Sequence, residues 1–220
     1  MRTDHDRLED LADAVARAEP YFDEPARRIA LATYRRLAQG TPAPAKDVAE
    51  QAGESVGLAE QLLGSWPGVF RDDRGDVVGF WGLTIDKLVP THAIEVKGRR
   101  LYAWCAWDTL FLPGILDAGA RVESTCPVTK ESISLVVRPD GVGETSHPQA
   151  VVSFLLPGTR FDANVIQSFC HFVHLFASRV AGASWTAEHP GTFLLSLEDA
   201  FELGRLVNAR NFPSLAGERR

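Results

Sequence analysis

The chain has 220 residues, of which 45% are hydrophobic and 24% are charged, and its net charge is −6. This composition is typical of a globular protein and argues against a disordered or fibrous chain. The negative charge, without any basic block, argues against a broad nucleic-acid-binding surface, because phosphate binding requires clustered Lys and Arg. The length allows one large domain, or a small module joined to a main domain.

The N-terminal region does not have the pattern of a signal peptide, because acidic and basic residues interrupt it throughout. No apolar run approaches the roughly 20 residues that span a bilayer. The three cysteines, Cys105, Cys126 and Cys170, are an odd number, so we expect free thiols and no disulfide framework. The sequence therefore predicts a cytoplasmic protein without a membrane partner.

The first part of the chain is predicted to be mainly helical. Apolar residues at helical spacing, separated by Gly and Pro, predict helices over residues 7–17, 26–37, 45–52 and 56–65. Residues 66–85 then predict a β-hairpin with its turn at residues 73–75. We expect residues 1–84 to form an N-terminal helical module.

The order of these elements is that of a winged helix, which is common in DNA-binding regulators. However, no Lys or Arg occurs between Lys46 and Arg71. A helix that enters the major groove needs donors for phosphates and base edges, and the candidate recognition helix has none. We therefore interpret this winged-helix-like module as a structural lid or brace, and we expect no nucleic-acid partner.

Residues 85–220 are predicted to form the catalytic part, which is rich in β-structure. Strands are predicted within residues 91–98, 99–104, 120–125, 132–139 and 150–157. Helices are predicted over residues 108–116 and 197–209, the second with Ser196 as its N-cap. An antiparallel sheet with flanking helices, after a helical module, places the protein in the α+β class.

Cys105 lies between a strand-like run and a helix that we expect to begin near Asp108. Backbone N–H groups are unpaired at such a junction, which favours a thiolate. Asp108 faces the same pocket if the first helical turn has formed. This segment alone also allows a buried cysteine beside an aspartate that caps the helix, because free cysteine is among the most buried residue types.

Cys170 lies in an apolar and aromatic segment that also contains His171 and His174. All three are compatible with the protein core. A cysteine nucleophile at Cys105 with either histidine as base is also allowed, but no local signature of a cysteine hydrolase surrounds them.

Cys126 is followed by proline in a turn between predicted strands. This position indicates a structural or modestly reactive surface thiol and argues against a catalytic one. A structural zinc site is only weakly supported, because the sequence has no closely spaced pair of cysteine ligands.

Three segments together resemble the alkylmercury lyases: "RRLYAWCAWDTL", "STCPVTKE" and "IQSFCHFVHLFAS". The resemblance extends over residues 99–208, and the helical N-terminal part fits the same family. It implies an enzyme that cleaves carbon–mercury bonds, in which Cys105 and Cys170 match the two essential thiols and Asp108 the essential acid. At the position of His171 the better-known members carry a second cysteine, which is not essential in this family. We expect activity to persist and the release of mercury to change.

The chemistry of such a reaction suits these residue types. Mercury is a soft cation that thiolates bind better than oxygen ligands do, and two thiolates would keep the product Hg(II) bound. The carbon must receive a proton from a positioned acid. The neighbours of Asp108 in the sequence include the apolar residues Trp104, Trp107, Leu110 and Phe111. Such neighbours would desolvate the carboxyl and so favour its protonated form.

The resemblance implies further expectations about partners. The enzyme would need no cofactor, because mercury belongs to the substrate. Low-molecular-weight thiols would bring mercury in and carry it away, and mercuric reductase would receive the Hg(II). The alternative is a winged-helix metal-sensing regulator, or a non-catalytic soft-metal-binding protein, that uses the same cysteines.

Overall fold

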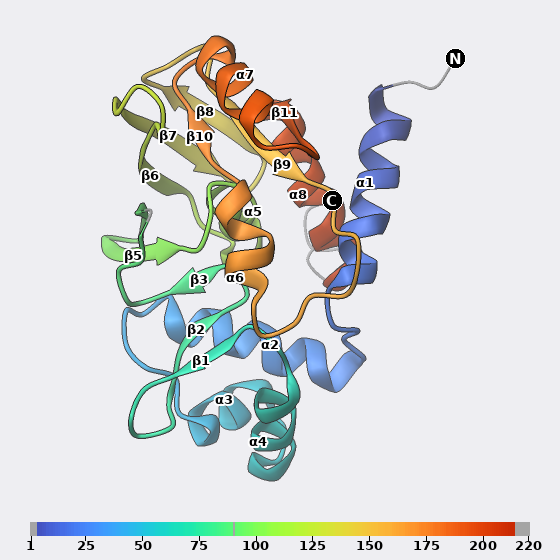
Figure 1. Ribbon diagram of the computed structural model, residues 1–220. Coiled ribbons are helices and arrows are strands. Elements are labelled where there is room, and N and C mark those ends of the chain that lie inside the picture. Colours follow the sequence, from blue (N-terminus) through green and yellow to red (C-terminus); the bar gives the residue numbers. More distant parts are fainter. Residues whose placement is uncertain (1–3, 90, 214–220) are drawn as a thin grey trace.

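The computed structural model describes residues 4–89 and 91–213, which form helices around two antiparallel sheets (Figure 1). The first part contains helices α1 (Asp4–Ala18), α2 (Glu24–Leu37), α3 (Ala45–Ala52) and α4 (Val56–Ser65). These helices confirm the four predicted ones. Asp23 and Ser55 cap α2 and α4 by accepting backbone N–H groups.

The predicted hairpin is also present, as β1 (Val69–Arg71) and β2 (Val77–Phe80), and β3 (Leu83–Thr84) follows directly. Gly75, in the β1–β2 turn, has a φ of 87°, a conformation that glycine adopts without steric cost. The helices and the hairpin thus follow the expected order. The assignment of this part as a winged helix stays a prediction.

The larger sheet joins the two parts of the chain. Its later strands are β4 (His92–Val96), β5 (Arg99–Ala103), β6 (Ala120–Thr125), β7 (Ser132–Arg138) and β8 (Gly141–Thr145). The strand order is β1-β2-β3-β5-β4-β6-β7-β8, and β3 pairs with β5. The sheet is therefore continuous across residue 84, and the division into residues 1–84 and 85–220 stays a prediction.

A smaller sheet contains β9 (Val151–Leu155), β10 (Leu175–Phe176) and β11 (Thr192–Ser196) in the order β10-β9-β11. The sequence predicted residues 150–157 in one sheet with the earlier strands, and this was wrong. The β9 strand is buried along almost its whole length. It therefore lacks the polar and apolar alternation that would indicate which sheet it joins.

The remaining helices are α5 (Asp108–Leu116), α6 (Val165–Ser168), α7 (Arg179–Glu188) and α8 (Leu197–Asn211). The predicted helices at 108–116 and 197–209 are confirmed, and the Ser196 side chain accepts the Asp199 N–H at 3.0 Å. Helix α5 is buried on nearly all sides and packs against α8 and the larger sheet. This position explains its predominantly apolar sequence.

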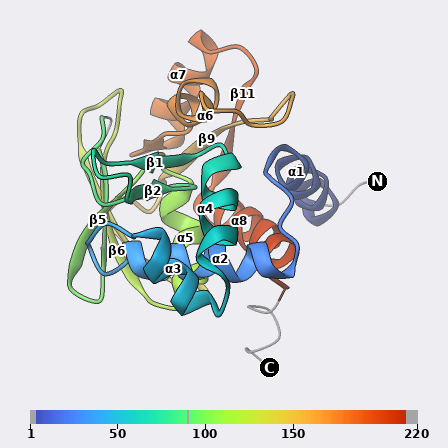
Figure 2. The same ribbon diagram turned by 90° about the horizontal axis from the view of Figure 1, so that it is seen from below.

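The first and last helices lie side by side, as Figures 1 and 2 show for α1 and α8. Arg210 of α8 forms ion pairs with Glu9 and Asp13 of α1. The Tyr34 hydroxyl of α2 donates to the carbonyl of Trp81 at 2.8 Å. Within the described ranges, no helix is long and apolar enough to cross a membrane.

Candidate functional site

Cys105 and Asp108 are positioned by the connection between β5 and α5. The backbone N–H of Cys105 donates to Oδ2 of Asp108 at 2.7 Å, so the carboxyl at the start of α5 turns back over the preceding segment. The N-cap of α5 is Trp107, and no side chain caps this helix. Asp108 is therefore not a helix cap, in contrast to one alternative that the sequence allowed.

Cys170 is brought to this connection by contacts between distant segments. It begins the 3₁₀-helix Cys170–Phe172, directly after α6. The N–H of Ala106 donates to the carbonyl of Val173 at 3.2 Å, which links the two cysteine-bearing segments. The Ser153 hydroxyl of β9 donates to the carbonyl of Phe172 at 2.8 Å and holds the segment against the smaller sheet.

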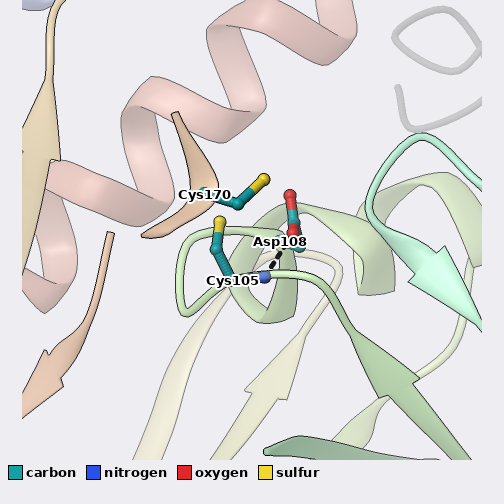
Figure 3. A group of neighbouring side chains, drawn as sticks. All are labelled: Cys105, Asp108 and Cys170. Carbon is teal, nitrogen blue, oxygen red and sulfur yellow. Dashed lines mark hydrogen bonds between the residues drawn. The ribbon is translucent and has the colours of Figure 1, made fainter. Parts of the chain in front are cut away.

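The two thiols and the carboxyl form one compact cluster (Figure 3). One ligand atom from each of Cys105, Asp108 and Cys170 lies within 4.8 Å of the other two. All three side chains are buried. The structure thus brings together the three residues that the resemblance implied, in an arrangement that could hold one soft metal ion.

An apolar pocket adjoins this cluster. Asp108 and Cys170 line it, whereas Cys105 has no exposed surface and is not among the residues that line it. Aromatic and aliphatic side chains form most of the wall: Phe22, Trp81, Trp104, Trp107, Phe111, Ile115, Phe161, Val165, Phe169, Val207 and Phe212. Such a surface suits an organic substituent and excludes water.

Burial controls the protonation of Asp108 and Cys105. Desolvation raises the pKa of Asp108 from its ordinary 3.8 to about 7, although hydrogen bonds with Cys105 and Trp104 oppose the shift. Desolvation also raises the pKa of Cys105 well above its ordinary value, and the contacts with Cys170 and Asp108 add to it. The helix start was expected to favour a thiolate at Cys105, and this was wrong because burial outweighs the helix dipole.

Cys170 is under opposing influences. Its hydrogen bond with Cys105 lowers its pKa, but burial and the nearby Asp108 together outweigh this bond, so the pKa of Cys170 lies above its ordinary value. Both cysteines are therefore protonated thiols at neutral pH. A reaction that needs their thiolates must also supply a group that accepts the protons.

We expect Asp108→Asn to stabilise the protein at pH 8 and not at pH 4. Because the pKa of Asp108 is raised to about 7, the folded state binds more protons than the unfolded state above pH 4, and the free energy of unfolding falls as pH rises to 7. The ionised carboxyl costs at most about 4 kcal/mol above that pH, and asparagine removes this cost. Thermal unfolding at both pH values checks the prediction. A variant less stable than the wild type at pH 8 would contradict it.

The turn between β2 and β3 leaves room for the Asp108 carboxyl. Gly82 has a φ of +90°, and a Cβ atom there would lie 2.7 Å from Oδ1 of Asp108. Its carbonyl accepts the N–H of Trp104 at 3.0 Å. A side chain at this position would displace the carboxyl, so the cluster requires glycine at position 82.

The other candidate residues lie outside the cluster. His171 is exposed. The ring of His174 packs on Trp185, with centroids 5.0 Å apart, and burial lowers the pKa of His174 to about 4. Among the described residues, those that line the pocket include neither histidine. The arrangement gives no support to a cysteine nucleophile with a histidine base.

Cys126 lies in the turn between β6 and β7, as expected, but it is fully buried and is not a surface thiol. Its sulfur accepts the Thr129 N–H at 3.5 Å. Burial opposes its ionisation, but hydrogen bonds from Thr129 and from backbone groups outweigh burial and lower the pKa of Cys126. The sulfur therefore acts as a local acceptor that stabilises the turn.

Replacing Cys126 with serine should leave most single-turnover cleavage of an organomercurial intact. The residue lies outside the cluster that holds Cys105, Asp108 and Cys170, and a serine oxygen can accept the same backbone N–H. Hydrocarbon release in one turnover, compared with the wild type, measures the effect. Complete loss of cleavage in a folded Cys126→Ser protein would show that Cys126 takes part in the reaction.

The contribution of the N-terminal part to the pocket was not predicted from the sequence. Glu19, Tyr34 and Trp81 line it together with Asp108. Burial raises the pKa of Glu19 to about 7, a hydrogen bond from Asn211 opposes this shift, and the proximity of Asp108 adds to it. A glutamate before a proline at the end of a helix is ordinary, so no local signal marked this residue.

Known proteins are similar to this chain in sequence and in fold. The alkylmercury lyase family model matches residues 89–208. An alkylmercury lyase of Staphylococcus epidermidis is 43% identical over 177 residues, which cover 80% of this chain and 79% of that protein. One from Bacillus cereus is 42% identical over 79% of this chain and 78% of that protein.

A crystal structure of the mercury-bound form of MerB2 has a similar fold, with a TM-score of 0.70 and 24% sequence identity. The similarity covers 91% of this chain and 96% of that one. The α+β class predicted from the sequence is confirmed by this similarity and by the helices and sheets described above. The family model, the sequence relatives and this structural similarity together show that the chain belongs to the alkylmercury lyase family.

Proposed function

We propose that this protein cleaves the carbon–mercury bond of organomercurials by protonolysis, releasing a hydrocarbon and retaining Hg(II) on Cys105 and Cys170. The observation that carries the proposal is the buried cluster of two thiols and one carboxyl that adjoins an apolar pocket. The thiols supply soft ligands for mercury. The carboxyl supplies a group that can accept and donate a proton at neutral pH.

Mercury capture begins at Cys170, because this thiol lines the pocket while Cys105 does not line it and has no exposed surface. An organomercurial that enters as R–Hg–SR′ exchanges its thiolate for Cys170. The sulfur of Cys170 bonds to mercury, and its proton leaves with the departing thiol as R′SH. The product of this step is Cys170–S–Hg–R, in which the organic group R occupies the apolar pocket.

The second step involves Cys105 and Asp108. Asp108 accepts the proton of the Cys105 thiol as that sulfur bonds to mercury, and then transfers the proton to the carbon. The electron pair of the carbon–mercury bond forms the new carbon–hydrogen bond, so R–H leaves and mercury stays bound to two sulfurs. The raised pKa of Asp108, about 7, makes both transfers accessible because acid and base forms coexist near neutrality.

The aromatic wall of the pocket receives the organic group. The ring of Phe161 lies 5.1 Å from that of Phe169 and 5.9 Å from that of Trp81. Methyl, ethyl and phenyl substituents can all be bound by such an apolar surface. The same surface keeps water from Asp108, which holds the pKa of this carboxyl near neutrality so that both its ionised and its protonated forms are available.

The reaction as proposed needs no cofactor, because mercury enters as part of the substrate. Low-molecular-weight thiols accompany mercury into the site and remove the Hg(II) product, and mercuric reductase is the proposed recipient. We place the reaction in the cytoplasm, where thiols remain reduced.

A single-turnover experiment tests the proposal. Protein in slight excess over phenylmercury should give a product whose mass exceeds that of the free protein by one mercury, without the phenyl group. A stable product that retains the phenyl group would show that the cysteines bind organomercurials without cleaving them.

A further inference from the structure

A second hollow opens beside the apolar pocket and carries positive charge. Four arginines line it: Arg17 of α1, Arg27 of α2, Arg160 and Arg210 of α8. We call this hollow the arginine vestibule. It shares Glu19, Phe22 and Asn211 with the apolar pocket, so the two spaces meet along one wall and the vestibule adjoins the site that holds Cys170.

The arginines of the vestibule are largely unpaired. Arg210 is neutralised by Glu9 and Asp13, and Arg27 uses its Nε to donate to the carbonyl of Asn211 at 2.9 Å. Within residues 4–89 and 91–213, no carboxylate pairs with Arg17, Arg27 or Arg160.

The acidic residue of the vestibule does not neutralise these charges. Glu19 is the one acidic residue among the described residues that line it, and its carboxyl accepts from Asn211. A concentration of positive charge in a protein of net charge −6 focuses anions at this position.

Two consecutive residues separate the vestibule from the apolar pocket. Arg160 lines the vestibule, and Phe161 lines the pocket. The N–H of Phe161 donates to the carbonyl of Ala18 at 2.8 Å, which fixes this loop across the end of α1. The loop therefore presents a cation to one space and an aromatic ring to the other.

We propose that the arginine vestibule binds the carboxylate groups of the low-molecular-weight thiols that carry mercury to and from Cys170. This inference rests on the proposed function. Guanidinium groups bind carboxylates in a paired, directional geometry. The ligand class is a small thiol that bears one or more carboxylates.

The position of the vestibule favours the thiol over the organic group as the source of the carboxylate. The lining of the apolar pocket suits the organic group R of R–Hg–SR′. A carboxylate on the thiol would lose its hydration in that pocket without gaining a cationic partner, whereas the arginines of the adjoining vestibule can bind it. After cleavage, two incoming thiols R′SH transfer their protons to Cys105 and Cys170 and leave as Hg(SR′)₂.

The test measures removal of Hg(II) from the mercury-loaded full-length protein by two thiols of similar size, 3-mercaptopropionate and the neutral 3-mercaptopropanol. The rate constant for 3-mercaptopropionate divided by that for 3-mercaptopropanol reports the effect of the carboxylate charge, with the neutral thiol as the internal reference. Replacing Arg17, Arg27 and Arg160 together with glutamine should lower this ratio by about tenfold, the loss expected for a few partly exposed charge contacts. Added salt should lower the wild-type ratio.

Matched controls make the result decisive. Arg74→Gln, in the exposed β1–β2 turn, removes the same charge far from the vestibule and should leave the ratio unchanged. Arg160→Gln alone, at an exposed loop position, should lower the ratio by a smaller factor and repeats the test without altering a helix. A triple variant that folds and keeps the wild-type ratio would overturn the proposal.

A further comparison identifies the source of the carboxylate. The affinities for 4-mercuribenzoate and phenylmercury, measured with a neutral thiol, should respond equally to the arginine replacements. A selective loss for 4-mercuribenzoate would assign the vestibule to the substrate's organic group and overturn the proposal. Absence of hydrocarbon release with every thiol would instead defeat the proposed cleavage, while the exchange ratio still reports on the vestibule.

Discussion

Asp108→Asn should still bind organomercurials but release hydrocarbon at least roughly 10²-fold more slowly than the wild type, the loss typical of removing a general acid. Asparagine keeps the size of the side chain, and its carbonyl oxygen can still accept the Cys105 N–H that Asp108 accepts at 2.7 Å. It cannot carry the proton from the thiol to the carbon. The variant should therefore still capture organomercurials through the two thiols but cleave the carbon–mercury bond slowly.

The adduct formed by this variant provides the measurement. Mass spectrometry should show Asp108→Asn protein with added mass that includes both mercury and the organic group. Hydrocarbon release at the wild-type rate would contradict the assignment of Asp108 as proton donor. Because His171 is exposed and His174 lies outside the pocket, neither is placed to replace it without rearrangement.

Replacing either Cys105 or Cys170 with serine should reduce turnover by roughly 10⁴-fold or more, the scale of losing a nucleophile. A serine hydroxyl is a hard ligand that does not replace a thiolate on mercury. The two variants should nevertheless differ. Cys105→Ser leaves the pocket-facing thiol and should accumulate the organomercurial adduct, whereas Cys170→Ser should capture organomercurials much more slowly.

The rate of adduct formation, followed by mass spectrometry, distinguishes the two variants. Cys126→Ser is the matched control, because it makes the same substitution at a buried thiol outside the cluster. Equal capture rates in Cys105→Ser and Cys170→Ser would refute the proposed order of attack. Wild-type turnover in either variant would refute a two-thiol mechanism.

Local sequence signals predicted much of the fold. The helices at 45–52 and 56–65 have the predicted bounds because Pro44, Gly53 and the capping Ser55 mark their ends. The helix at 108–116 also has the predicted bounds. The division of the strands between two sheets was not predictable, because β10 has only two residues and β9 is buried throughout most of its length. Pairing between such strands depends on tertiary packing.

The candidate site was predictable only in part. The proximity of Cys105 and Asp108 follows from their spacing, but that of Cys170 was implied only by the family resemblance. Contacts between distant segments produce it, such as the bond from Ala106 to Val173. The protonated state of Cys105 was predicted wrongly, because burial depends on the whole fold and here outweighs the local effect of the helix start.

The most direct test of carbon–mercury cleavage is to mix purified protein with phenylmercury and an excess of thiol and to measure benzene by gas chromatography. We expect catalytic release, with many benzene molecules formed per protein molecule and Asp108→Asn as the negative control. No benzene above the level given by thiol alone, with phenylmercury bound to a folded protein, would contradict carbon–mercury cleavage and leave a protein that binds mercury without cleaving its bond to carbon.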